Sequence, residues 1–227
     1  GVILCIEAAF MLPPFALAVA DGNEAAMRGF ASGIMAVLLV GLPCGIIRSK
    51  DRPLGARDGF VTVALAWIII SLFGAVPFYA SGVIPSISGA VFETVSGLTT
   101  TGSTIVTDVE SMTRGGLFWR SFTHWIGGMG ILVFIMAVLP MGGDHAMHIM
   151  RAEVPGPTVG KLVPRLRNTA KILYLIYTGL TVIETGLLLL GGMSFYDALL
   201  HAFATAGTGG FSTRAASIAA FDSVYIE

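Results

Sequence analysis

The stretch ISGAVFETVSGL (Ile87–Leu98), followed directly by TTTGST (Thr99–Thr104), decides the fold. Its first part is apolar, but as a helix with a rise of ~1.5 Å per residue it reaches only about 18 Å. A helix that crosses ~30 Å of hydrocarbon needs about 20 residues. Non-helical backbone is tolerated at membrane depth only where it is buried in protein or lines a water-filled cavity. The stretch therefore predicts a re-entrant half-helix followed by a polar loop.

Five longer apolar runs surround this stretch, and each has the length of a membrane-spanning helix. They are Val2–Ala20, Gly29–Ile47, Gly59–Ala80, Leu117–Leu139 and Ile172–Leu190. The whole chain of 227 residues is 55% apolar and 12% charged, with a mean hydropathy of +0.83. Ordinary soluble domains are about 25% charged. We therefore expect an all-α membrane protein, and no cleaved signal peptide, because no basic segment precedes the first run.

Charge and cysteine content exclude several other classes of protein. The net charge of −1 leaves no basic footprint for nucleic acid. The two cysteines, Cys5 and Cys44, form neither a disulfide framework nor a zinc-binding spacing. The chain is thus expected to work without nucleic acid and without a structural metal.

The basic residues orient the helices. Most of the 13 lie in two loops, Arg48–Asp58 and Met141–Lys171, which we expect to be cytoplasmic because such loops collect Lys and Arg. The segment Ser81–Gly116 holds few basic residues and is expected outside. The two basic loops share a side only if an even number of crossings separates them. The stretch Ile87–Leu98 must therefore enter and leave on the outer face.

The loop after the half-helix has the chemistry of a cation site. Thr99–Thr104 is polar, β-branched and interrupted by one glycine, so it has poor helix propensity. We expect an extended strand that turns its carbonyl groups toward an axis, where a ring of carbonyls replaces the hydration shell of a monovalent cation. The half-helix adds the negative end of its dipole near Leu98. Both effects favour a cation over an anion.

The arrangement occurs a second time, as basic loop, spanning helix, glycine break, short apolar stretch and Thr/Gly loop. The second short stretch is Tyr196–Ala206, and Gly207–Thr213 follows it. A shift of 108 residues pairs Thr100 with Thr208, whereas a shift of 109 pairs Ser103-Thr104 with Ser212-Thr213, and the sequence leaves this register open. The repeat predicts a fold assembled from copies of one unit.

The motifs resemble those of a known family. FETVSGLTTTG (Phe92–Gly102) resembles the first pore loop of the Trk/Ktr/HKT potassium-transporter superfamily, and WIGGMGI (Trp125–Ile131) resembles the inner helix after it. RAEVPGP (Arg151–Pro157) and the segment Phe203–Thr213 match the Trk branch most closely. The resemblance implies four non-identical helix–pore-helix–helix repeats, preceded by two extra helices, in the bacterial inner membrane.

The resemblance implies that this chain corresponds to the N-terminal half of a longer pore subunit, and it suggests four parts. The expected parts are two N-terminal helices with a basic loop (1–58), a first pore repeat (59–139), a cytoplasmic loop (140–168) and an incomplete second repeat (169–227). Two pore loops do not close a four-sided filter, and the family's gating loop belongs to the third repeat.

The resemblance also implies which residues form the filter and which ion they take. Six residues are expected to bind the ion, namely Thr100, Thr101, Gly102, Thr208, Gly209 and Gly210. Four more are expected to support the pore loops, namely Thr99, Ser103, Gly207 and Phe211. A serine at the filter glycine of loop one is linked to sodium permeation in this superfamily. Gly102 therefore favours potassium as the transported ion, with no organic cofactor.

Two acidic residues lie at membrane depth, where an ionisable group is by default a functional hypothesis. For Glu93 the sequence leaves two roles open, an external charge at the pore mouth or a structural partner behind the filter. Glu184 is expected to form a buried pair or to lie at the interface.

The same residues argue against two other functions. A proton- or sodium-coupled secondary transporter needs a titratable relay inside its helices, but Leu117–Leu139 holds only Arg120 and His124, both near the outer end. A serine hydrolase, with His124 and Ser121 or with His201 and Ser212, lacks a nucleophile elbow and an orienting acid. Passive conduction needs no catalytic group, so we expect no enzyme.

Two further patterns are assigned to ordinary structure. Asp144, His145 and His148 are better explained by a solvated loop than by a metal site. The glycines of Gly127–Gly130 follow no strand, so they predict close helix packing and no dinucleotide loop.

The resemblance implies membrane lipid, a homodimer and a cytoplasmic nucleotide-binding ring as partners, with Arg151–Lys171 as the contact for the ring.

Overall fold

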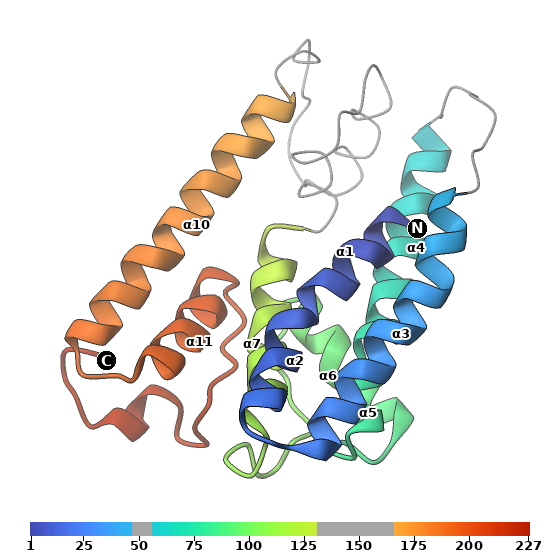
Figure 1. The fold of residues 1–227 in the computed structure, drawn as a ribbon. Coiled ribbons are helices and arrows are strands. Elements are labelled where there is room, and N and C mark those ends of the chain that lie inside the picture. Colours follow the sequence, from blue (N-terminus) through green and yellow to red (C-terminus); the bar gives the residue numbers. More distant parts are fainter. Residues whose placement is uncertain (47–55, 131–165) are drawn as a thin grey trace.

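The computed structural model describes residues 1–46, 56–130 and 166–227. These residues form α-helices and one short 3-10 helix, and none of them lies in a β-strand, which confirms the predicted all-α fold. Figure 1 shows the helices side by side, with the two short helices α6 and α11 among the long ones.

The chain opens with a helical hairpin. Its first arm is α1 (Val2–Phe10) followed by α2 (Leu12–Ala20), which together form one apolar span broken at Met11. The break precedes two prolines, which lack the N–H groups that would continue the helix and are tolerated only in its first turn. The second arm is α3 (Glu24–Ile46), which starts earlier than predicted because Asn23 accepts a hydrogen bond from the Ala26 N–H at 2.9 Å.

The first repeat begins with α4 (Ala56–Gly74) and α5 (Val76–Ala80), which form one span. The half-helix α6 (Ile87–Leu98) has the bounds that the sequence predicted, and the Ser86 hydroxyl caps it by accepting from the Gly89 N–H. The next described helix is α7 (Arg114–Gly128). In Figure 1 the starts of α6 and α7 lie at the same end of the molecule. The chain therefore returns to that end after α6, which makes α6 re-entrant.

The second repeat contains the long helix α10 (Leu166–Leu190), the short helix α11 (Phe195–Ala206) and the 3-10 helix η2 (Ser217–Phe221). The helix α11 begins one residue before the predicted start and packs on both α7 and α10. Ser194 caps it, as Ser86 caps α6.

Four of the five predicted spans are long and apolar enough to cross a membrane in the described residues. They are Val2–Ala20, Glu24–Ile46, Phe60–Ala80 and Ala170–Leu190. The fifth, Leu117–Leu139, begins within α7 and continues outside the described residues. Asp144, His145, His148 and most of the two basic loops also lie outside them.

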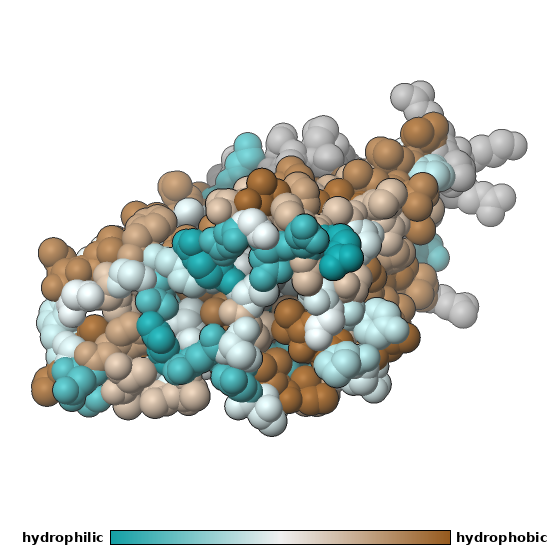
Figure 2. All heavy atoms as spheres, turned by 60° about the horizontal axis from the view of Figure 1, so that its bottom comes forward, coloured by the Kyte–Doolittle hydropathy of each residue, from teal (hydrophilic) through white to brown (hydrophobic). Residues whose placement is uncertain are grey.

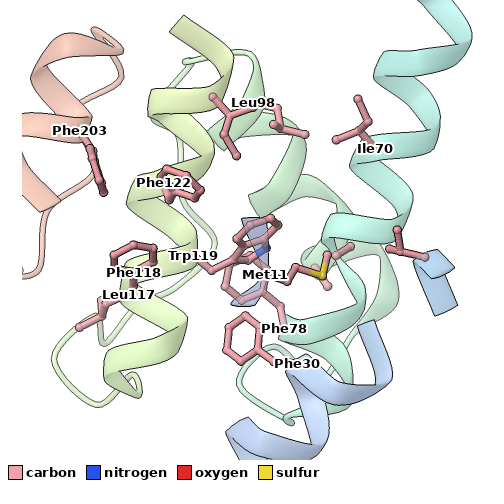
Figure 3. Packing of buried hydrophobic residues seen from close by; sticks show 14 of the residues in the cluster. Met11, Phe30, Ile70, Phe78, Leu98, Leu117, Phe118, Trp119, Phe122 and Phe203 are labelled. Atoms are coloured by element: carbon pink, nitrogen blue, oxygen red, sulfur yellow. The ribbon is translucent and has the colours of Figure 1, made fainter. Parts of the chain in front are cut away.

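The core centres on α7, which joins the hairpin to both repeats (Figure 3). Trp119 is fully buried and donates its indole N–H to the Gly74 carbonyl at 2.9 Å. The Phe122 ring lies 5.3 Å from Phe10 in α1 and 5.3 Å from Phe203 in α11, measured between ring centroids. Aromatic pairs at these separations contribute about 0.5–1.5 kcal/mol beyond the area they bury. The helix α7 is therefore placed firmly against the hairpin on one side and α11 on the other.

The outer surface divides into apolar flanks and one polar end. Large apolar side chains such as Leu39 and Leu175 are mostly exposed along α3 and α10, as expected for helices that face lipid. Figure 2 looks onto the end of the molecule that holds the turns before α3, α6 and α7. Hydrophilic residues gather across the middle of that end, and hydrophobic residues flank them.

Candidate functional site

Two loops with the same backbone pattern follow the two short helices. Loop one (Thr99–Thr104) follows α6, and loop two (Gly207–Thr213) follows α11. In loop one Thr100 has φ +55° and Gly102 has φ +75°, and in loop two Thr208 has φ +57° and Gly210 has φ +84°. The predicted extended strand is therefore wrong, because every second residue here is left-handed.

The left-handed threonines are the strained positions of these loops. A β-branched residue with positive φ is an outlier, and such strain of about 1–3 kcal/mol persists where the surroundings enforce it, often at functional sites. The Thr100 N–H donates to the Gly97 carbonyl at 3.0 Å and the Thr208 N–H donates to the Thr205 carbonyl at 2.8 Å. In a regular strand successive groups face opposite sides. Left-handed residues at alternate positions break that rule and let neighbouring carbonyls face the same side.

These matching features settle the repeat register at 108 residues. The caps Ser86 and Ser194, the ends of α6 and α11, and the left-handed residues all superimpose at this shift. The shift of 109 residues, which paired Ser103-Thr104 with Ser212-Thr213, is wrong. Thr104 corresponds to Ser212 instead, and Glu93 corresponds to His201.

No main-chain N–H of the described residues donates to the carbonyl oxygens of residues 99–102 and 207–211. The neighbouring carbonyls are occupied. The Ser103 carbonyl accepts from the Ser96 hydroxyl, and the Ser212 carbonyl accepts from Arg120 Nη1 at 3.1 Å. Two runs of carbonyls that no main-chain N–H occupies, available to a cation, thus remain, and each run is followed by an engaged carbonyl. The predicted supporting residue Ser103 lies just beyond the first run.

The two loops touch each other and touch α7. A Cβ atom on Gly102 would overlap the Gly209 carbonyl oxygen, and a Cβ on Gly209 would overlap the His124 ring. A Cβ on Gly207 would overlap the His124 backbone, while Gly127 lies equally close to the Leu98 backbone. Glycine is therefore required at these places by close approach, which confirms the packing role predicted for Gly127.

A buried ion pair lies behind the loops. Arg120 Nε donates to Glu93 Oε1 at 2.6 Å, and both side chains are almost fully buried. The carboxylate also accepts from the Thr104 hydroxyl at 2.8 Å and from the Ile105 N–H at 2.9 Å. Of the two roles left open for Glu93, the structure assigns the structural partner. Arg120 then extends this support to loop two through the Ser212 carbonyl.

The second repeat has different chemistry at the equivalent place. His201 Nε2 lies 2.9 Å from the Ser212 hydroxyl, and His201 Nδ1 lies 2.7 Å from the Asp197 carbonyl oxygen. A serine hydrolase needs a carboxylate on that ring nitrogen, and here it meets a main-chain carbonyl. The His201–Ser212 pair therefore braces loop two. Glu184 is half-buried in α10 and lies within reach of Thr205 near the end of α11.

Comparison with known proteins places the chain in a family. Residues 25–227 match the family model TrkH, described as a cation transport protein. The chain belongs to this family. Its apolar helices and its family make it a multi-pass protein of the inner membrane, related to transporters and not to enzymes.

The relatives are Trk system potassium uptake proteins. The chain is 41% identical to TrkH of Halomonas elongata over its whole length and 40% identical to TrkH of Escherichia coli over 98% of its length. A crystal structure of the potassium transporter TrkH from Vibrio parahaemolyticus matches all of this chain with a TM-score of 0.81 and 35% identity. The chain covers 48%, 47% and 45% of these proteins, so it spans about half their length.

Proposed function

We propose that this chain forms two quarters of a potassium-translocating pore within a longer membrane subunit. The observation that carries the proposal is the pair of loops with left-handed threonines and unoccupied carbonyls. The relatives named as potassium uptake proteins support the choice of ion.

In this proposal the carbonyl oxygens of six residues bind the ion as it passes. They are Thr100, Thr101, Gly102, Thr208, Gly209 and Gly210. A carbonyl ring replaces the water shell of potassium, and the end of each half-helix adds a partial negative charge nearby. Thr99, Gly207 and Phe211 support the loops. Glu93 and Arg120 hold the loops from behind without touching the ion, so the chain supplies geometry and no catalytic chemistry.

A proton- or sodium-coupled transporter is the second candidate. One observation favours it, because the Glu7 carboxyl in α1 is buried and has no hydrogen-bond partner among the described residues. An ionisable group inside a spanning helix is what a coupled mechanism requires. Glu7 lies beside Gly74 and Thr94, behind the pore helix, so a proton there does not enter the ion path.

Flux through reconstituted full-length protein separates the two candidates. Proteoliposomes are loaded with potassium, and uptake of radioactive rubidium is measured with and without gradients of pH and sodium. A channel-like pore gives uptake that follows the rubidium and potassium gradients alone. Uptake that requires a proton or sodium gradient, and that Glu7→Gln abolishes, would establish coupled transport instead.

The proposal includes two partners that the resemblance implies, a second copy of the subunit and a cytoplasmic nucleotide-binding ring. The Arg151–Lys171 segment expected to contact the ring lies outside the described residues. The sequence of this chain has no nucleotide-binding loop, so the proposal assigns any nucleotide control to the partner. Tight binding of ATP or NAD by the purified full-length subunit alone would contradict this assignment.

A further inference from the structure

His124 contacts both loops at the place where the unoccupied carbonyls begin. Its side chain is fully buried in α7, and its Nδ1 lies 2.7 Å from the Gly97 carbonyl oxygen. A carbonyl only accepts, so the proton is on Nδ1. The Gly97 carbonyl also accepts from the Thr100 N–H. This carbonyl is thereby engaged by two donors, three residues before the left-handed Thr100.

The other side of His124 holds loop two. Its ring stacks on Phe211 with 4.0 Å between the ring centroids and an angle of 15° between the planes. The Arg120 guanidinium carbon lies 3.6 Å from the centroid of the same Phe211 ring. At these distances the imidazole and the guanidinium do not both fit on one face of the Phe211 ring. Phe211 is therefore inserted between His124 and Arg120, which lie one helical turn apart on α7.

The edge of the imidazole closes the remaining space against Gly209. A Cβ there would overlap His124 Cδ2 and Nε2, so the ring sets how near loop two comes to α7. His124 Nε2 has no hydrogen-bond partner among the described residues. A charged imidazolium would leave a buried N–H without an acceptor, which is costly, so the neutral ring fits this place. His124 acts here as a fixed spacer with one donor.

We propose that His124 is a positioning residue for ion selectivity, because it fixes loop one through Gly97 and loop two through Gly209 and Phe211. It does not touch the ion. It sets the separation of the two carbonyl runs, and potassium is distinguished from sodium only while that separation holds. This inference rests on the proposed pore function.

The test compares three substitutions in full-length protein, expressed in cells that lack other potassium uptake. His124→Ala removes the donor and the ring, His124→Phe keeps the stacking ring without the donor, and His124→Asn keeps a donor without the ring. The readout is the ratio of rubidium to sodium uptake at matched amounts of protein in the membrane. We expect the ratio to fall about tenfold in His124→Ala, which is ~1.4 kcal/mol of discrimination. His124→Phe and His124→Asn should each restore part of it.

Phe118→Leu is the matched control. Phe118 is another buried aromatic residue of α7, and its ring packs on Phe122 and Phe203. This change should lower the amount of folded protein without changing the uptake ratio. A merely structural role for His124 would give the same result, with less protein and an unchanged ratio, and would overturn the inference.

Two outcomes separate this inference from the pore function on which it rests. If Gly102→Ser shifts the ratio and the His124 variants do not, the inference alone is wrong. If neither shifts the ratio in protein that takes up rubidium, the pore assignment is wrong as well. Should His124→Ala fail to reach the membrane, His124→Phe and His124→Asn decide, because wild-type ratios in both would contradict the inference.

Discussion

Gly102 and Gly210 occupy matching places in the two loops, yet their surroundings differ. Both have positive φ, which disfavours any other residue. A Cβ on Gly102 would also overlap the Gly209 carbonyl oxygen, whereas a Cβ on Gly210 would meet no atom of the described residues within 4 Å. The two glycines therefore share a backbone constraint, and only one of them has a steric constraint as well.

This difference makes a graded prediction for selectivity. Gly102→Ser and Gly102→Ala should displace the Gly209 carbonyl and lower the rubidium-to-sodium uptake ratio about tenfold, equivalent to ~1.4 kcal/mol. The same changes at Gly210 should act in the same direction with a smaller effect. Ser111→Ala, outside both loops, should leave the ratio unchanged. An equal effect at Gly102 and Gly210 would show that contact with Gly209 does not control the filter.

The Glu93–Arg120 pair makes a prediction for stability. Removing one partner of a buried ion pair costs about 3–5 kcal/mol, because the other charge is left uncompensated. Arg120→Met should therefore lower the melting temperature of the purified protein strongly. Adding Glu93→Gln should recover part of the loss, since it removes the uncompensated charge and its amide oxygen can still accept from either Thr104 or Ile105. A double variant less stable than Arg120→Met alone would contradict the uncompensated charge as the cause.

At the residue scale, sequence reasoning identified the chemistry of the loops but missed what holds them. Threonine and glycine after a short apolar stretch are a local pattern, and that pattern was enough to select both loops. The left-handed angle of Thr100 was unexpected, because threonine disfavours it and only the fold enforces it. Contacts of His124 with Gly97 and Phe211 join separate elements, so no local periodicity could predict them.

Hydropathy predicted which elements are present, and capping residues fix where α3 and α6 begin. The helix α6 was predicted with its observed bounds from its short apolar run, and the structure adds that the Ser86 side chain caps its start. The start of α3 was predicted too late, because its charged first turn was assigned to a loop. Asn23 caps that turn, and an acidic residue in a first turn is favourable.

The cap of α6 can be tested directly. The Ser86 hydroxyl accepts the Gly89 N–H at 3.1 Å, so Ser86→Ala should cost about 1 kcal/mol of stability. Ser88→Ala is the matched control, because Ser88 is exposed in the first turn of the same helix and no described hydrogen bond involves its hydroxyl. Thermal unfolding in detergent measures both. Equal melting temperatures for the two variants would show that the cap does not stabilise α6.

At the scale of the whole molecule, contacts between distant segments gather the predicted outer loops at one end. Arg114 Nη1 donates to Asp21 Oδ1 at 2.9 Å, which joins the start of α7 to the turn before α3. The Tyr196 hydroxyl donates to the Arg114 carbonyl, which adds the start of α11. Figure 1 places these turns at one end and the starts of α4 and α10 at the other. Hydropathy and charge predicted this alternation of the two ends.

Sidedness is therefore the prediction that tests the whole arrangement. In full-length protein with every native cysteine replaced by alanine, Cys5 and Cys44 among them, a cysteine is introduced at exposed positions by Ser111→Cys or by Lys171→Cys. If basic loops are cytoplasmic, an impermeant thiol reagent should label Ser111→Cys in intact cells and Lys171→Cys only after permeabilisation. The two positions lie at opposite ends of the molecule, so their accessibility must differ. Labelling of Ser111→Cys from the inside alone would place α6 on the cytoplasmic face and invert the ion path.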